Sequence, residues 1–91
     1  ISLSVVDNFL HDKFPRQRFA SLAIADSEWG DKLVLVVDGS MDPGMIKEAL
    51  RTEFGAHAVP KEILFNKEIP LLSIGKPDRK KLRELFETIS K

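Results

Sequence analysis

With 91 residues, the chain is long enough for one domain with a single modest hydrophobic core. Its 14 basic and 14 acidic residues cancel, so overall charge does not draw it to nucleic acid or to an anionic membrane. It has no cysteine, which excludes disulfides, thiolate metal sites and a cysteine nucleophile and is compatible with a cytoplasmic location. The longest apolar run, Leu33 to Val37, is too short to cross a bilayer.

The first predicted helix runs from Ser4 to Lys13. It begins with SVVD, which resembles a capping box in which Ser4 and Asp7 satisfy the free N–H groups at the helix start. Pro15 stops this helix. Its core-facing residues follow helical spacing: Val6, Phe9 and Leu10. A weak strand is predicted over residues 18–25, with every second side chain on one face: Ala20, Leu22 and Ile24.

The middle of the chain predicts a buried strand followed by a helix. Residues 32–37, KLVLVV, are apolar and β-branched, which predicts a strand buried on both faces. Asp42 and Pro43 form a helix start, with aspartate as the cap and proline at the first helical position. Gly55 supplies the stop. The apolar side of this helix comprises Ile46, Ala49, Leu50 and Phe54.

A third strand is predicted from Glu62 to Phe65, after Pro60, and a last helix from Asp78 to Ile89. The lysines and arginines of the last helix face outward, opposite an apolar stripe. The stripe comprises Leu82, Leu85, Phe86 and Ile89. The order α-β-β-α-β-α predicts an α+β fold, with a small central sheet of about three strands packed with three helices.

The loop before the last helix contains one lysine, Lys76, between a glycine and a proline. Pro77 disfavours helical backbone at Lys76, so the ammonium is expected to project from the loop. Gly75 permits a tight turn or a close approach to a ligand. Such an ammonium suits a point-charge contact with phosphate or carboxylate oxygens. The remaining glycines and the Ser/Thr of a phosphate loop are missing, so that motif is excluded.

The other candidate sites have ordinary structural explanations. His11 and His57 are the only histidines, and no acidic pair lies at ligand spacing beside either, so no metal site is predicted. No serine has a histidine or lysine placed by sequence to activate it. The basic run from Arg79 to Arg83 is typical of a solvated helix face.

The chain also resembles the C-terminal lid domain of the adenylate-forming enzymes, which include acyl- and aryl-CoA synthetases, peptide-synthetase adenylation domains and luciferases. The segments that carry the resemblance are VPKEILF (59–65), EIP (68–70) and SIGKPDRKKLREL (73–85). Residues 20–37 are similar to two strands of the family and the acidic turn between them. Residues 1–10 lie where the family has the helix that follows its interdomain hinge. The resemblance covers essentially the whole chain, and residues 75–79 are its most specific part.

The resemblance implies that the chain, residues 1–91, is a small lid. It would close over a large N-terminal domain that holds ATP and a carboxylic acid and is absent here. The start at Ile1, without methionine, is expected to be a cut in a longer polypeptide, with the hinge upstream. In the family, the acid's carboxylate attacks the α-phosphorus of ATP, pyrophosphate leaves, and an acyl-adenylate forms. A second half-reaction transfers the acyl group to a thiol, usually that of CoA.

The resemblance also assigns roles to residues of the loop. Lys76 matches the catalytic lysine of the family, which bridges the acid and phosphate oxygens during adenylation. Gly75, Asp78 and Arg79 match residues that support the loop, with Asp78 as a helix cap and Arg79 as a brace. ATP, Mg²⁺ and CoA are expected to serve the full-length enzyme, and none is expected to bind tightly to this domain alone, which would be inactive. The expected partners are the large domain and these substrates, without nucleic acid or membrane.

Some positions depart from the family pattern. Pro77 stands where the family usually has isoleucine or valine, and Leu71 and Leu72 replace more polar residues. GAHAVP (55–60) replaces the usual approach to the third strand, and the connector over residues 36–45 is short. This compact form is most similar to the o-succinylbenzoate–CoA ligases of menaquinone biosynthesis. Acid specificity itself is expected to reside in the absent domain.

Two other functions compete with the ligase interpretation. Residues 76–83 could bind RNA or a protein partner as part of a stand-alone α+β binding module, although the predicted strands lack the exposed aromatic residues that stack bases. The domain could also have a purely structural docking role in which Lys76 is incidental.

Overall fold

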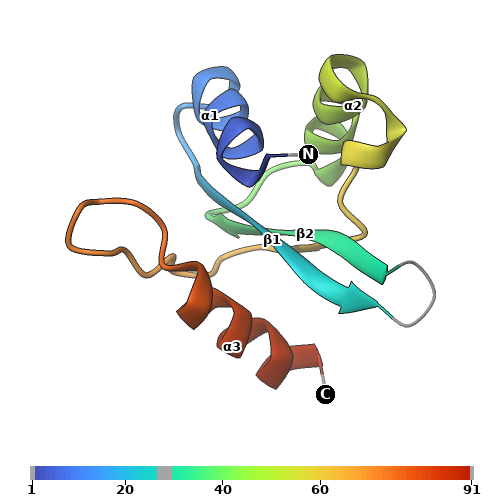
Figure 1. Cartoon of the computed structure of the whole chain (residues 1–91). Coiled ribbons are helices and arrows are strands. Elements are labelled where there is room, and N and C mark those ends of the chain that lie inside the picture. Colours follow the sequence, from blue (N-terminus) through green and yellow to red (C-terminus); the bar gives the residue numbers. More distant parts are fainter. Residues whose placement is uncertain (1, 27–29, 91) are drawn as a thin grey trace.

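The computed structural model describes residues 2–26 and 30–90, with the side chains at positions 26 and 87–90 outside the description. The elements in these ranges are α1 (Leu3–Lys13), β1 (Arg18–Asp26), β2 (Gly30–Asp38), α2 (Pro43–Phe54), the 3₁₀ turn η1 (Ala56–Ala58), β3 (Glu62–Leu64) and α3 (Arg79–Ser90). The predicted α+β class and the order α-β-β-α-β-α are confirmed (Figure 1). Only the short η1 was not predicted.

The strands form one mixed sheet in the order β1-β2-β3. β1 and β2 are antiparallel, with Phe19 opposite Val37, whereas β2 and β3 are parallel, with Leu35 opposite Ile63. A short connection suits an antiparallel pair, and the longer connection through α2 suits a parallel pair. β2 is therefore the central strand. Its residues 34–37 are buried, as the KLVLVV pattern predicts.

Helices cover both faces of the sheet: α1 and α2 lie on one face and α3 on the other (Figure 1). The core consequently has two parts. The first packs under α1 and α2 and comprises Val6, Leu10, Phe19, Leu35, Val37, Ile46 and Leu50. The second packs under α3 and comprises Ala20, Leu22, Val34, Val36, Ile69, Leu82 and Phe86. Within β1 and β2, odd-numbered core residues face the first part and even-numbered ones the second, because strand side chains alternate.

The two ends of α2 agree with the sequence prediction. Asp42 caps the helix, its Oδ1 accepting a hydrogen bond of 2.9 Å from the backbone N–H of Gly44, and Pro43 is the first helical residue. The helix stops before Gly55, whose φ of 101° is unfavourable for residues with a Cβ.

The predicted capping box of the first helix is wrong. α1 begins one residue earlier, at Leu3, and its N-cap is Ser2, whose hydroxyl accepts a hydrogen bond of 3.4 Å from Val5 N–H. Ser4 and Asp7 therefore do not form a capping box, because Asp7 lies beyond the first turn. Its carboxylate is used elsewhere in the structure.

The last helix begins close to the prediction, but the prediction that all its lysines and arginines face outward is wrong for Arg79, whose side chain is half-buried and binds Ser21 and Asp7. α3 begins at Arg79, one residue after the predicted start, and Leu82 and Phe86 of its apolar stripe are buried. Leu85 is only half-buried, and the side chain of Ile89 lies outside the described residues. No helix in the described part of the chain is long and apolar enough to cross a membrane.

Truncation of a core side chain tests this packing. Leu50→Ala in α2 removes a fully buried side chain, so we expect it to lower the free energy of unfolding by about 2–5 kcal/mol. Met45→Ala on the same helix is the matched control, because Met45 is 54% exposed. It should change stability by no more than about 0.5 kcal/mol. Urea unfolding followed by circular dichroism measures both, and equal effects would contradict the packing.

Candidate functional site

The Lys76 loop, residues 70–78, leads into α3 and extends away from the sheet (Figure 1). Leu71 and Pro77 face each other across its base in an isolated antiparallel bridge. Three backbone hydrogen bonds close the loop: Leu72 N–H to Lys76 O (2.7 Å), Gly75 N–H to Leu72 O (2.8 Å) and Asp78 N–H to Pro70 O (2.8 Å). The lysine is therefore carried on a backbone with a defined path.

Gly75 makes the turn before Lys76 possible. Its φ is 87°, in the left-handed region that residues with a Cβ rarely adopt. A Cβ at this position would have no atom within 4 Å, so open space is available and the backbone conformation alone requires glycine.

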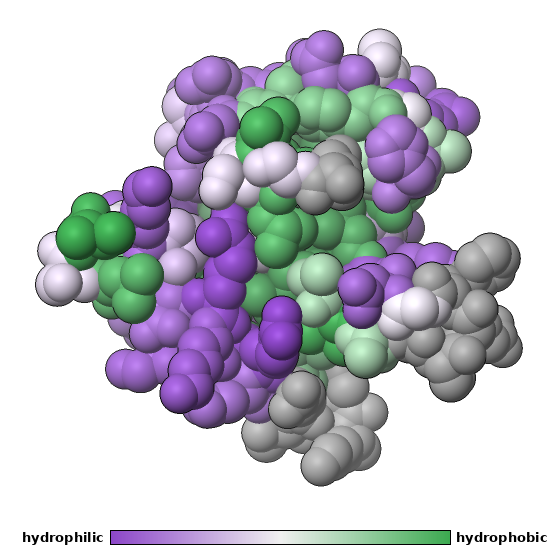
Figure 2. All heavy atoms as spheres, viewed as in Figure 1, coloured by the Kyte–Doolittle hydropathy of each residue, from purple (hydrophilic) through white to green (hydrophobic). Residues whose placement is uncertain are grey.

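The side chain of Lys76 is exposed, and it makes no ion pair or side-chain hydrogen bond with any residue that the structure describes. Three apolar neighbours in the loop are also exposed: Leu71, Leu72 and Ile74. Hydrophobic side chains protrude from the molecule on the side where this loop lies (Figure 2). Because none of the described residues neutralises the ammonium, it can meet an anion on another molecule or domain.

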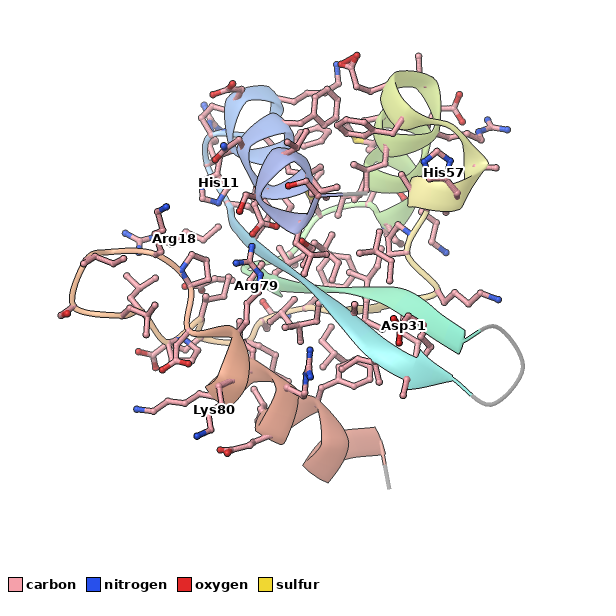
Figure 3. The ribbon with its side chains drawn as sticks, in the orientation of Figure 1. His11, Arg18, Asp31, His57, Arg79 and Lys80 are labelled. Atoms are coloured by element: carbon pink, nitrogen blue, oxygen red, sulfur yellow. The ribbon has the colours of Figure 1, made fainter. Side chains whose placement is uncertain are left out.

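Asp78 and Arg79 follow the loop and point to different partners. Asp78 Oδ1 accepts a hydrogen bond of 3.2 Å from Lys81 N–H, so Asp78 caps the first turn of α3. Arg79 reaches across β1 towards α1 (Figure 3). Its Nε donates to the carbonyl of Ser21 (3.1 Å), and its Nη2 donates to Asp7 Oδ2 (2.5 Å). Arg79 therefore braces the end of the loop against the body of the domain itself.

Asp7 is a buried carboxylate on α1. Its second oxygen, Oδ1, accepts a hydrogen bond of 2.8 Å from Ser21 N–H. Burial raises the pKa of the Asp7 carboxyl above its usual 3.8. The hydrogen bonds with Ser21 and the positive charges of Arg79 and His11 oppose this rise without cancelling it.

Asp7 and Ser21 were not predicted as partners of the loop. One signal for Asp7 was present: positions 3, 6, 7 and 10 share one face of a helix, and three of them are apolar. An acid on such a face is buried and needs a partner. Ser21 gives no such signal, because the hydrogen bonds of 2.8 Å to Asp7 and 3.1 Å to Arg79 use its backbone N–H and carbonyl, groups that do not distinguish serine from other residues.

Shallow hollows lie on both sides of the Lys76 loop. One, of about 260 Å³, lies between α1 and the loop and is lined by residues that include Asn8, His11, Lys76 and Arg79. The other, of about 410 Å³, includes Arg18 in its lining. His11 borders both hollows, with its Nε2 3.3 Å from the backbone N and O of Phe19.

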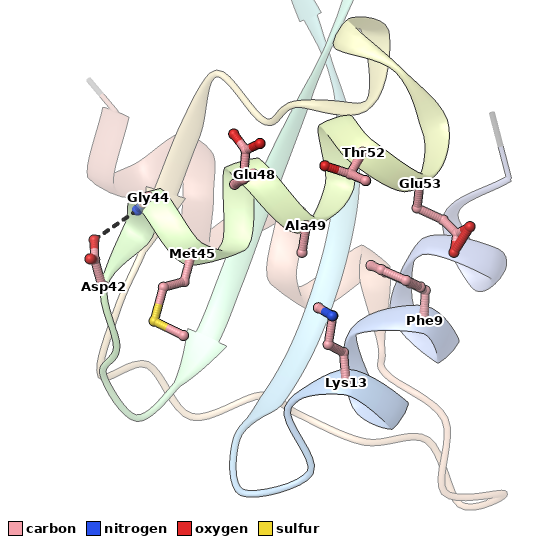
Figure 4. A pocket seen from close by; sticks show the side chains of 9 residues that line it. All are labelled: Phe9, Lys13, Asp42, Gly44, Met45, Glu48, Ala49, Thr52 and Glu53. Carbon is pink, nitrogen blue, oxygen red and sulfur yellow. Dashed lines mark hydrogen bonds between the residues drawn. The ribbon is translucent and has the colours of Figure 1, made fainter.

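A third hollow, of about 570 Å³, is separate from this loop. It lies between α1 and α2, with Phe9 and Lys13 on one side and Ala49 and Thr52 on the other (Figure 4). No residue of the Lys76 loop lines it. The hollow is therefore not part of the candidate site.

Two other kinds of site find no support in the described residues. The described residues contain no group of three histidine, aspartate or glutamate side chains that could hold a metal ion. Both sheet faces are covered by helices, and no phenylalanine in the described ranges is exposed, so the described part of the sheet shows no aromatic surface for stacking bases.

The chain is similar in sequence to part of several acid–CoA ligases. No family model matches the chain. A 2-succinylbenzoate–CoA ligase from Listeria innocua is 30% identical over 70 residues, which are 75% of this chain and 15% of that protein. A mitochondrial malonate–CoA ligase from Mus musculus is 36% identical over 67 residues, or 69% of this chain and 12% of that protein. The chain thus spans less than a fifth of the length of these relatives.

Solved structures show the same fold within larger enzymes. An amide bond synthetase from Marinactinospora thermotolerans superposes with a TM-score of 0.80 at 28% identity, covering 94% of this chain and 18% of that one. An acyl-CoA synthetase from Brucella canis has a TM-score of 0.80 at 20% identity, covering 100% and 18% of the two chains.

The buried carboxylate predicts a pH dependence of stability. Because the pKa of Asp7 is higher in the folded than in the unfolded state, the folded state binds the proton more tightly, and stability falls as pH rises from 3.8 through the folded pKa. Asp7→Asn cannot ionise, so we expect the wild type to lose stability relative to this variant between pH 3.5 and pH 7. Urea midpoints at several pH values measure the difference. A relative gain would instead indicate that the ion pair outweighs burial.

Proposed function

The chain is homologous to the adenylate-forming acyl-CoA ligases, and from this we propose that it is the C-terminal domain of an ATP-dependent carboxylic acid–CoA ligase. The aligned part of this chain is only 15% of one relative and 12% of another, which fits a small lid on a large nucleotide-binding domain. The proposed enzyme joins a carboxylic acid to ATP, releasing pyrophosphate and forming an acyl-adenylate. It then transfers the acyl group to the thiol of CoA and releases AMP.

We assign Lys76 to the adenylation half-reaction. A carboxylate that approaches a triphosphate brings two anions together, and charge is redistributed as the bond to the α-phosphorus forms and the bond to pyrophosphate breaks. A positioned ammonium lowers the repulsion and orients the two reactants. The observation that supports this role is that Lys76 is exposed, unpaired within the described residues and carried on a hydrogen-bonded loop.

The position of the lysine on a lid also suits a two-step reaction. The ammonium is needed while the carboxylate attacks the α-phosphorus. Afterwards the thiol of CoA must reach the carbonyl carbon of the acyl-adenylate. A lysine on a separate small domain can be withdrawn when that domain rotates. Mg²⁺ would act with ATP, and because the described part of this chain has no cluster of metal-binding side chains, we place Mg²⁺ on the large domain.

Replacement of Lys76 in the full-length enzyme tests the proposal. We expect Lys76→Ala to slow acyl-adenylate formation by about 10²- to 10³-fold, because a charge that stabilises the transition state is lost. Thioester formation from supplied acyl-adenylate should be nearly unchanged. Pyrophosphate release measures the first step, and CoA consumption measures the second.

Lys80→Ala is the matched control for this experiment. Lys80 is also an exposed lysine close to the loop, but it points away from the sheet (Figure 3). Its removal changes the net charge equally and should leave both half-reactions within about twofold. If Lys76→Ala slowed both half-reactions equally and only mildly, the result would contradict the proposed role of Lys76.

For the acid, we propose o-succinylbenzoate, which is 2-succinylbenzoate, and hence a role in menaquinone biosynthesis. The support is the 2-succinylbenzoate–CoA ligase among the relatives, together with the short connector over residues 36–45. Other relatives are named for salicylate, indoleacetate and malonate, so these acids are the natural competitors.

A panel of acids tests this finer assignment. With the full-length enzyme, we expect kcat/KM for pyrophosphate release to be at least tenfold higher with 2-succinylbenzoate than with salicylate, indoleacetate or malonate, since an unmatched polar group on an acid is costly to bury. Preference for another acid would overturn the substrate assignment but leave the role of Lys76 intact.

A further inference from the structure

The free edge of β1 is bound by side chains instead of a fourth strand. Among the described residues β1 pairs only with β2, so the backbone groups of alternate residues on its other side have no strand partner there. Side chains of α1 and α3 bind these groups at Phe19, Ser21 and Ala23. The hydrogen bonds are His11 Nε2 with Phe19 N–H (3.3 Å), Asp7 Oδ1 with Ser21 N–H (2.8 Å), Arg79 Nε with Ser21 O (3.1 Å) and Arg83 Nη2 with Ala23 O (3.2 Å).

Ser21 is the point at which both helices meet this edge. Asp7 comes from α1, on one face of the sheet, and Arg79 from the start of α3, on the other face. Their side chains also bind each other around the edge of β1, with 2.5 Å between Asp7 Oδ2 and Arg79 Nη2. The side chain of Asp7 is 8% exposed and that of Arg79 is 30% exposed. Loss of either partner would leave a largely buried charge without compensation.

This contact lies next to the Lys76 loop in the chain. Arg79 is the third residue after Lys76. The residue before it, Asp78, closes the loop through the hydrogen bond from its N–H to Pro70 O. Arg79 therefore ties the closed base of the loop to β1 and α1. The rest of α3 is held separately by the burial of Leu82 and Phe86. We therefore expect loss of the contact to shift the loop more than it disturbs the packing of α3 on the sheet.

We propose that Asp7 is a positioning residue for the adenylation half-reaction: by holding Arg79 at the edge of β1, it fixes where the loop presents Lys76. This inference rests on the proposed function of Lys76. A lysine that acts on reactants in another domain is placed only as accurately as its loop is attached to its own domain. A displacement of about 1 Å is enough to cost about 10²-fold in rate.

The test uses Asp7→Asn and Arg79→Gln in the full-length enzyme, singly and together. Asparagine is nearly isosteric and keeps an oxygen for Ser21 N–H, but it loses the charge that holds Arg79. We expect each single variant to lower kcat of adenylation about 10- to 10²-fold with KM for ATP and acid within about threefold. Thioester formation from supplied acyl-adenylate should be unchanged. Because both residues act through one contact, the double variant should be no slower than the slower single variant.

Arg83→Gln is the matched control. Arg83 lies one turn further along α3 and donates to the carbonyl of Ala23, two residues beyond Ser21 on the same strand edge, but it binds neither Asp7 nor the loop. It should change adenylation by less than about twofold. Circular dichroism melting identifies any variant that fails to fold. If Asp7→Asn does not fold, Arg79→Gln tests the positioning role by the same criteria. In that variant the Asp7 carboxyl can take up a proton, so no unpaired charge stays buried.

Other outcomes would overturn the positioning role. These are equal losses in both half-reactions, a double variant whose loss is the product of the single losses, or an Arg83→Gln variant as slow as Asp7→Asn. Lys76→Ala, measured in parallel, separates the two proposals. If Lys76→Ala adenylates normally, the proposed function fails. If only Lys76→Ala is slow, the proposed function stands and the role of Asp7 is rejected.

Discussion

A carboxylate from α1 and a guanidinium from the first residue of α3 meet at Ser21, on the edge of β1 that no strand covers. The placement of the loop depends on this contact. A three-stranded sheet leaves backbone groups free along each outer strand, and such an edge invites pairing with another chain. In this domain, side chains from the two helical layers bind those groups. The same contacts join two layers that otherwise pack on opposite faces with separate cores.

The cations near the start of α3 are used in two ways. Arg79 and Arg83 donate to backbone carbonyls of β1, so their charge serves the domain itself. Lys76 has no such partner within the described residues and keeps its charge at the surface. A group that is to neutralise an anion on another module cannot be paired internally, because breaking that pair would offset the gain. A loop already closed by hydrogen bonds also loses less conformational freedom on contact. Both features fit the proposed function in a chain of zero net charge.

The wrong capping prediction and one of the two missed partners of the loop concern the same residue, Asp7. Asp7 follows Ser4 at capping-box spacing, and a short-range pattern is all that a local motif can test. The structure begins α1 earlier, caps it with Ser2 and directs Asp7 to β1 and α3. An acid on the apolar side of a helix indicates that some partner exists, but it does not indicate which one. Arg79 is 72 positions away in the chain, and several other cations were equally possible partners.

The sequence by itself determined the elements, their order, the two-sided burial of β2 and the presence of a lysine between glycine and proline. These follow from periodicity, helix punctuation and local backbone preferences, which act over a few neighbouring residues. Tertiary structure alone decided that α1 and α3 lie on opposite faces, that Asp7 and Arg79 meet around the edge of β1, and that Lys76 stays unpaired among the described residues. Such contacts join segments far apart in the chain, and only the packing of the whole domain brings them within a few ångströms of one another.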